Sequence, residues 1–192
     1  MEQLVDKFVH NLERLQIVQS KDTQLCKYGI EIFLSSVIEI ISILLLSLFV
    51  GNIIETLLFF LMFVPLRIYA GGYHANTRLR CYFVSLGMYA LFTVTLLTLP
   101  VSWYTITNVS CSLFSCFMIY AVSPVIHRNK SVSLQEKSHY RKISLKICLT
   151  ETIIILFTTV LFPNNIFSCS MAMGQIAVII GMLVGKLNQI KK

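Results

Sequence analysis

The sequence predicts an all-α polytopic membrane protein with about six transmembrane helices, an N-terminal amphipathic helix at the membrane interface and both termini in the cytoplasm. Three observations predict this fold class. Of the 192 residues, 56% are hydrophobic and only 13% are charged, whereas an ordinary soluble domain carries about 25% charged residues. Apolar runs long enough to cross a bilayer recur along nearly the whole chain. The basic residues are confined to segments on one side of these runs.

The first residues follow the spacing of an amphipathic helix. Apolar side chains lie opposite charged and polar ones, at Leu4, Val5, Phe8, Leu12 and Leu15. We therefore expect residues 1–26 to form an amphipathic segment on the inner surface of the membrane. A helix packed on the cytoplasmic loops explains the same pattern. The segment lacks the uninterrupted apolar core of a secretory signal peptide.

Six apolar runs follow, and each is a predicted transmembrane span. They cover residues 30–50, 53–69, 81–99, 103–121, 147–162 and 166–185. The fifth run is short for a bilayer unless it begins near Ile143. We expect residues 30–185 to form the transmembrane bundle and residues 1–192 to form a single integral membrane domain.

The placement of positive charge predicts the orientation. The turns at residues 51–52, 100–102 and 163–165 contain no Lys or Arg, and all 16 basic residues lie in the remaining loops and termini. The positive-inside rule therefore places both termini in the cytoplasm. Topology and anionic lipid headgroups account for the net charge of +7. We accordingly predict membrane lipids, and not nucleic acid, as partners of these charges.

The segment between the second and third runs carries the candidate chemistry. It contains Arg67, the pair Gly71-Gly72, His74 and Cys81. A thiol nucleophile needs a base to accept its proton, and His is the side chain suited to that role near neutral pH. On the predicted topology this segment faces the reducing cytosol, which keeps the Cys81 thiol free.

Helix signals place the His and the Cys on different structures. The glycine pair should end the second span, and Asn76 and Thr77 are good N-cap residues, so a helix should start near Thr77 or Arg78. A straight helix would separate the His74 and Cys81 Cα atoms by about 10.5 Å, whereas a turn can fold His74 over Cys81. The helix N-terminus and nearby arginines favour the thiolate form of Cys81.

Other interpretations of this pair remain open. A His and a Cys a few residues apart are often unrelated. A zinc site usually needs at least three protein ligands, and the other histidines show no ligand spacing with Cys81. We therefore predict no metal and no cofactor. The other five cysteines lie mostly in apolar runs, where Cys acts as a small hydrophobic residue.

The combined pattern resembles the accessory gene regulator B (AgrB) family, membrane peptidases that process the precursor of a bacterial quorum-sensing peptide. The pattern is an Arg, then Gly-Gly-x-His, then a Cys seven positions after the His. The spans, the chain length and an Ala-x-x-Pro element at residues 121–124 also resemble the family. The resemblance implies that Cys81 is the nucleophile, His74 its base, and Arg67, Gly71 and Gly72 supporting residues.

The resemblance also implies a substrate and a location. The enzyme would be a cysteine endopeptidase that cleaves an AgrD-type precursor near its C-terminus through a Cys81 thioester, and then promotes closure of a thiolactone or lactone ring. It would act as a homodimer in the bacterial plasma membrane, with its active site at the cytoplasmic face. Weaker candidates for binding an acidic part of the substrate are Lys130, Lys137, Arg141 and Lys142. A solvated positive-inside loop is the favoured interpretation of these residues.

Ionisable residues inside spans are functional candidates by default. Glu31 and Glu151 are expected on the cytoplasmic side, and Glu39 near the middle of the membrane. Packing against polar neighbours also explains them and is the favoured interpretation. The alternative function is a small transporter or channel, which predicts many polar residues along several spans. A scaffold without activity would leave the segment from Arg67 to Cys81 unexplained.

Overall fold

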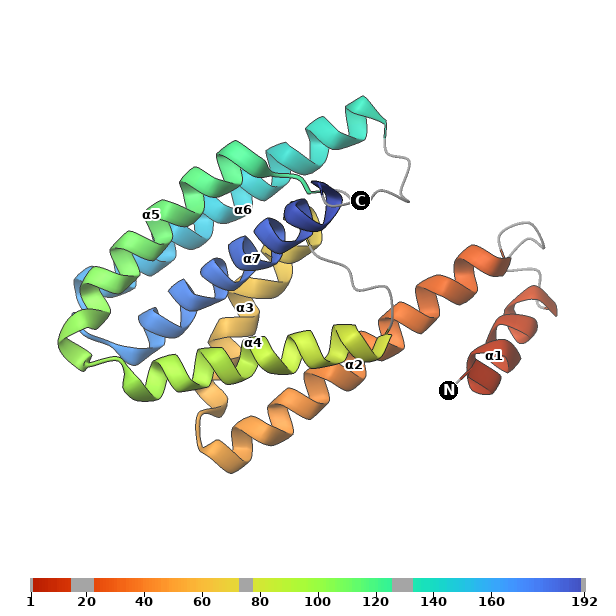
Figure 1. The fold of residues 1–192 in the computed structure, drawn as a ribbon, viewed down its shortest axis with the longest axis horizontal. Coiled ribbons are helices and arrows are strands. Elements are labelled where there is room, and N and C mark those ends of the chain that lie inside the picture. The colour runs from red at the N-terminus through yellow and green to blue at the C-terminus, as the bar shows by residue number, and fades with distance from the viewer. Residues whose placement is uncertain (1, 15–22, 73–77, 126–132, 191–192) are drawn as a thin grey trace. The chain divides into compact units, whose positions relative to one another are not determined.

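The computed structural model describes residues 2–14, 23–72, 78–125 and 133–190. These residues form α1 (Glu2–Arg14), α2 (Thr23–Val50), α3 (Ile53–Ala70), α4 (Arg78–Thr98), the short 3-10 helix η1 (Val101–Trp103), α5 (Tyr104–Val122), α6 (Leu134–Leu161) and α7 (Ile166–Ile190) (Figure 1). The only strand-like pairing among the described residues is an isolated bridge between Gly71 and Val125. The predicted all-α class is therefore confirmed.

Six helical stretches in the described residues are long and apolar enough to cross a membrane. They are Gly29–Val50, Ile53–Ala70, Leu79–Thr98, Val101–Val122, Leu134–Leu161 and Ile166–Leu187. Large apolar side chains such as Phe49, Leu97 and Val160 are exposed on them, as expected of surfaces that meet lipid acyl chains. The predicted number of spans is confirmed, while the orientation of the termini stays a prediction.

The fifth span differs from the prediction at its start. The predicted apolar run begins at residue 147, or near Ile143 if the span is to be long enough for a bilayer. Instead, α6 begins at Leu134. Its start carries a capping box, in which Ser133 Oγ accepts from the Glu136 amide at 3.2 Å and Glu136 Oε2 accepts from the Ser133 amide at 2.8 Å. Three described basic residues between Leu134 and Ile143 therefore lie on a helix, namely Lys137, Arg141 and Lys142.

The chain forms two compact units, residues 1–46 and 47–192. In the first unit, α1 is the helix predicted from the N-terminal pattern, and its Val5 and Val9 are buried. Lys27 on α2 forms an ion pair with Asp6 on α1. The position of α1 on the membrane surface and the single-domain assignment stay predictions.

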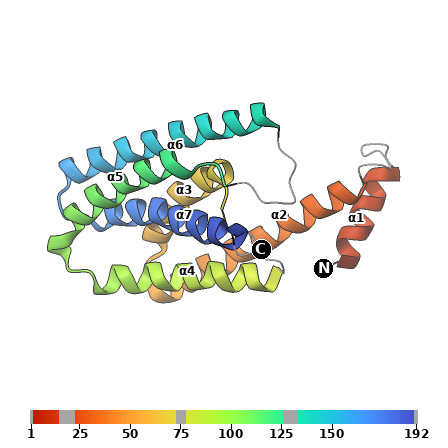
Figure 2. The ribbon, with the colours of Figure 1, turned by 45° about the horizontal axis from the view of Figure 1, so that its top comes forward.

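In the second unit, α7 is the central helix and packs against α3, α5 and α6 (Figures 1 and 2). The core between these helices includes Leu66, Ile119 and Ile179, which are almost fully buried. A Cβ on Gly174 would lie 2.6 Å from the Phe59 carbonyl oxygen. The absence of a side chain at Gly174 therefore lets α7 and α3 approach closely.

Helix α4 is attached near its Thr98 end by the turn between α2 and α3. Asn52 Nδ2 donates to Thr93 Oγ1 at 3.4 Å, and the Tyr89 hydroxyl donates to Asn52 Oδ1 at 3.1 Å. These contacts fix the half of α4 remote from Cys81. The other half of α4 starts at Arg78, where the N-cap signals predicted a helix to begin.

Candidate functional site

The C-terminal end of α3 supplies the first part of the site. Gly71 follows the last helical residue with φ 75° and ψ −153°, a conformation open almost only to glycine. The Gly71 amide donates to the Arg67 carbonyl at 3.2 Å. The Arg67 side chain then folds back, and its Nη1 donates to the Gly71 carbonyl. The guanidinium is thereby fixed to the turn that follows its own helix.

The glycine pair is joined to the segment after α5. The Gly72 amide donates to the Val125 carbonyl at 3.2 Å, and the Val125 amide donates to the Ala70 carbonyl at 2.9 Å. Residues 123–125 are anchored in turn, because Ser123 Oγ and Ser144 Oγ of α6 lie 2.7 Å apart. The end of α3 is therefore held by backbone hydrogen bonds to a segment that α6 supports.

Both glycines are required by their surroundings. A Cβ on Gly71 would collide with the Val125 carbonyl oxygen and lie 3.0 Å from its carbon. A Cβ on Gly72 would collide with the Arg67 guanidinium and lie 3.1 Å from the Gly181 carbonyl carbon. Gly72 also has a φ of 138°, where side chains are strained.

Helix α7 completes the surroundings of Arg67. A Cβ on Gly181 would lie 3.8 Å from Arg67 Nη1, so α7 offers the guanidinium a surface without a side chain. Arg67 is half-buried there. The guanidinium thus sits between its own turn and the backbone of a neighbouring span.

The candidate nucleophile lies close to this guanidinium. Cys81 is the fourth residue of α4, partly exposed and not in a disulfide. It is within electrostatic range of Arg67. A cationic group next to a thiol at a helix N-terminus favours the thiolate. His74, the predicted base, lies outside the described residues.

The other cysteines occupy different surroundings. Cys148 and Cys169 are buried in the bundle, and Cys116 Sγ lies 3.1 Å from Thr152 Oγ1 and 3.6 Å from Cys148 Sγ. These contacts are those of small packed side chains. Cys111 lines an apolar pocket and Cys26 belongs to the first unit.

The basic residues proposed to bind an acidic part of the substrate divide into two groups. Lys137 and Lys142 are exposed on the first turns of α6. Arg141 donates to the Tyr120 carbonyl at 3.0 Å, and its guanidinium lies 5.5 Å from the Tyr120 ring centroid. Arg141 therefore joins α6 to α5. Lys130 lies outside the described residues.

The carboxyl groups within spans belong to different parts of the fold. Glu151 is buried and paired with Gln175 on α7, and Glu31 and Glu39 belong to the first unit. The sequence alone did not identify Val125, Gln175 or the contact of Gly181 with Arg67. Only the Ala-x-x-Pro element before Val125 pointed to any of them, because contacts between distant residues leave no spacing signal.

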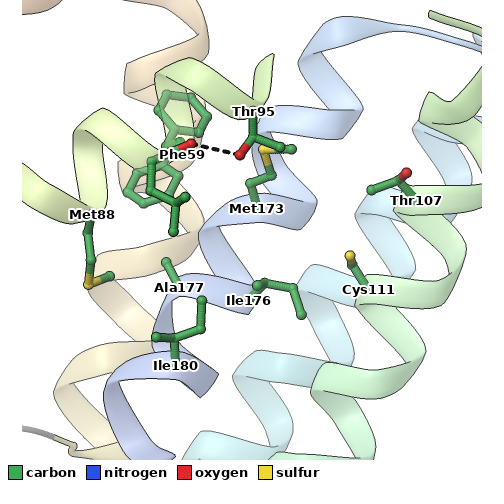
Figure 3. Close-up of a pocket in the computed structure, with 11 residues that line it drawn as sticks. Phe59, Met88, Thr95, Thr107, Cys111, Met173, Ile176, Ala177 and Ile180 are labelled. Atoms are coloured by element: carbon green, nitrogen blue, oxygen red, sulfur yellow. Dashed lines mark hydrogen bonds between the residues drawn. The ribbon is translucent and has the colours of Figure 1, made fainter. Parts of the chain in front are cut away.

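A cavity of about 190 Å³ lies elsewhere, between α3, α4, α5 and α7. Figure 3 shows Met173, Ile176, Ala177 and Ile180 of α7 lining it. The described residues around it include no charged side chain, and the Thr95 hydroxyl donates to the Leu91 carbonyl at 2.7 Å. Its chemistry is apolar, and it does not contain the candidate nucleophile.

These features define a class of protein. It is a multi-pass helical membrane protein in which a cysteine at the start of one span lies near an arginine at the end of the preceding span. The model of the accessory gene regulator B family matches residues 1–183. The chain therefore belongs to the AgrB family.

Individual relatives agree with this assignment. Protein FsrB of Enterococcus faecalis is 30% identical over 153 residues, which cover 76% of this chain and 63% of that protein. A putative AgrB-like protein of Listeria innocua is 26% identical, over 71% of this chain and 65% of that protein. Putative AgrB-like protein 2 of Clostridium perfringens is 25% identical, over 85% of this chain and 76% of that protein. The match thus spans less than two thirds of the first two relatives. No solved structure matches the chain.

Proposed function

We propose that this protein is a membrane cysteine endopeptidase that processes an AgrD-type precursor of a quorum-sensing peptide. The observation that carries the proposal is the position of Cys81 in the first turn of α4, within electrostatic range of the Arg67 guanidinium. Membership of the AgrB family supports the substrate class. His74 is seven residues before Cys81 and supplies the base.

The reaction follows from these groups. His74 accepts the thiol proton, and the Cys81 sulfur attacks the carbonyl carbon of the scissile peptide bond. The C–N bond breaks, and the C-terminal fragment leaves as an amine with the proton returned by His74. The N-terminal part of the precursor remains on Cys81 as a thioester.

A nucleophile of the bound peptide then closes the ring. Its Cys thiol or Ser hydroxyl attacks the thioester carbonyl, loses its proton and releases the Cys81 thiol. Exclusion of water prevents hydrolysis of the thioester at this stage. Exchange of one thioester for another is close to neutral in free energy, so ring closure needs no ATP. Loss of the C-terminal fragment pulls the first step, which is uphill.

The backbone geometry narrows the groups that can stabilise the tetrahedral oxyanion. The Gly71 and Gly72 amides already donate to the carbonyls of Arg67 and Val125. The remaining candidates are the Arg67 guanidinium and the backbone amides at the start of α4, both suited to developing negative charge. In this scheme Gly71 holds Arg67 through its carbonyl, and Gly72 leaves the space that the guanidinium occupies.

Further parts of the proposal concern the surroundings of the site. Lys137 and Lys142, exposed on α6, and Lys130 contact an acidic portion of the precursor, whereas Arg141 supports the helix that carries them. The site faces the cytoplasm of the bacterial cell, where the positive-inside rule places the basic segments. The family implies a homodimer.

The decisive experiment uses the protein in membranes with the precursor peptide, followed by mass spectrometry. Cys81→Ala should abolish cleavage, and His74→Ala should lower it by roughly 10²- to 10⁴-fold. Cys111→Ala is the matched control, since this thiol lies in the apolar pocket, and it should retain activity. A brief incubation of wild-type protein should leave peptide on Cys81 in a bond that hydroxylamine cleaves. Continued cleavage by correctly inserted Cys81→Ala would refute the proposal.

A further inference from the structure

A carboxyl and an amide meet in the interior of the bundle, away from the candidate site. Glu151 on α6 is 6% exposed and Gln175 on α7 is fully buried. Glu151 lies ten residues before the end of α6 at Leu161, and Gln175 lies nine residues after the start of α7 at Ile166. At 1.5 Å per residue, each is about 14 or 15 Å from these helix ends. Both residues therefore lie near the middle of a hydrocarbon layer about 30 Å thick, so Glu151 is deeper than the cytoplasmic side on which the sequence led us to expect it.

The two groups are joined by one hydrogen bond and leave two oxygens without a partner. Gln175 Nε2 donates to Glu151 Oε2 at 3.2 Å, to the Cys148 carbonyl at 3.3 Å and to Thr152 Oγ1 at 3.3 Å. The contact with a carbonyl, which only accepts, settles which end of the amide carries the nitrogen. Glu151 Oε1 and Gln175 Oε1 are buried with no hydrogen-bond partner.

The carboxyl also has no counter-charge in the described part of the chain. The ionisable groups near it are the thiols of Cys148 on α6 and of Cys116 on α5, which contacts Cys148 and Thr152. From α7 it faces the neutral amide of Gln175. Among the described residues of α3, α5 and α7, no basic side chain acts on Glu151. An ionised carboxylate here would be a buried and uncompensated charge, which is strongly disfavoured.

A single proton on Glu151 accounts for both the missing counter-charge and the missing hydrogen-bond donor. Placed on Glu151 Oε1, it removes the negative charge and turns that unpartnered oxygen into a donor, while Gln175 Oε1 is a buried acceptor without a donor. A carboxylic acid and an amide are both planar, and when they share one hydrogen bond they can form a second that closes a ring. In that ring the amide N–H donates to the acid carbonyl oxygen, and the acid O–H donates to the amide carbonyl oxygen. The two unpartnered oxygens are the atoms that such a ring requires.

We propose that Glu151 and Gln175 form a proton-binding site in the membrane interior, in which the neutral Glu151 acid donates from Oε1 to Gln175 Oε1 while it accepts from Gln175 Nε2. The site joins α6 to α7. Gln175 lies six residues before Gly181, whose backbone borders the Arg67 guanidinium. The pair therefore also holds α7 in the register that the candidate site requires. The proposal is independent of the peptidase assignment.

The test is infrared spectroscopy of the full chain in lipid vesicles at pH 7. Subtraction of the Glu151→Gln spectrum from the wild-type spectrum should leave the carbonyl stretch of a protonated carboxylic acid, which shifts down in deuterated water. Glu55→Gln, which alters a carboxyl near the Asn52 turn, is the control and should leave that band in place. A difference spectrum with only carboxylate bands would overturn the proposal.

A second variant tests whether the acid donates to Gln175, and a salt series distinguishes a bound proton from a bound cation. In Gln175→Leu the acid band should persist and move to higher frequency, because the acid loses both the amide acceptor of its O–H and the amide donor to its carbonyl oxygen. An unshifted band in that variant would show that the acid does not donate to Gln175. Carboxylate bands together with a sodium-dependent rise in unfolding temperature would assign a cation to the site and likewise overturn the proposal. Glu151→Gln should unfold within a few degrees of wild type, since two amides can form the same ring.

Discussion

Replacement of Gly71 by Ala tests how the candidate site is held together. Gly71 has φ 75° and ψ −153°, and a non-glycine residue in this region costs about 1–3 kcal/mol. The added Cβ also collides with the Val125 carbonyl, which is backbone and cannot rotate away. Relief requires movement of residues 123–125, which breaks the two backbone hydrogen bonds that join Val125 to Ala70 and Gly72, each about 0.5–1.5 kcal/mol. The sum is roughly 2–6 kcal/mol of local stability.

The expected result is a loss of processing that exceeds the loss of folded protein. If the substitution raises the activation free energy of processing by only about 2 kcal/mol, the rate falls about 30-fold. The assay is precursor processing in membranes, with the amount of inserted protein measured in parallel. The matched control is Gly87→Ala, because a Cβ on Gly87 meets no atom within 4 Å and Ala favours the interior of a helix. Equal processing by Gly71→Ala and Gly87→Ala would refute the reasoning.

Three further predictions follow from the fold. Single cysteines placed in the three turns without basic residues should be labelled by an impermeant reagent outside intact cells, and one at Asn129 should not; the turn positions are Asn52, Ser102 and Asn164. External labelling at Asn129 would reverse the orientation. Gly181→Ala should retain processing, since its Cβ would lie 3.8 Å from Arg67 Nη1, whereas Gly181→Leu should lower it roughly tenfold or more by displacing the guanidinium; equal activity of the two variants would contradict this contact. Ser133→Ala should lower the free energy of unfolding by about 1 kcal/mol through loss of the capping box, measured by denaturant titration against Ser138→Ala, which alters an exposed serine of the same helix.

The membrane architecture could be predicted from the sequence because lipid imposes a simple rule. A chain that crosses hydrocarbon must satisfy its backbone within helices, and each helix needs a long apolar run. The six runs are therefore visible without any tertiary information. The start of α6 was missed because hydropathy identifies the apolar residues that cross the bilayer and not the residue at which the helix begins. Ser133 and Glu136 stand three residues apart and form a capping box, and that local signal predicts a start near Leu134.

The candidate site was only partly predictable for a different reason. The helix start near Arg78 follows from local capping chemistry, and the structure agrees. The contacts that hold Arg67 come from residues more than 50 positions away, Val125 and Gly181. No periodicity within one segment encodes such contacts. Glu151 was recognised as unusual, but its placement next to Gln175 depends on how α6 packs against α7.

The distant contacts bear on what the glycines do. The lack of a side chain at Gly71 leaves room for the Val125 backbone. The lack of a side chain at Gly72 and Gly181 leaves room for the Arg67 guanidinium. These positions belong to the turn after α3 and to α7, and the segment they meet follows α5. The Arg67 guanidinium can be held near Cys81 only if these three parts of the chain are packed together. In the proposed enzyme, the charge that Arg67 adds to that of the arginines next to Cys81 is therefore a product of the folded bundle. An isolated peptide containing residues 67–81 would keep the His and the Cys, but it would lack the support that Val125 and Gly181 give to Arg67.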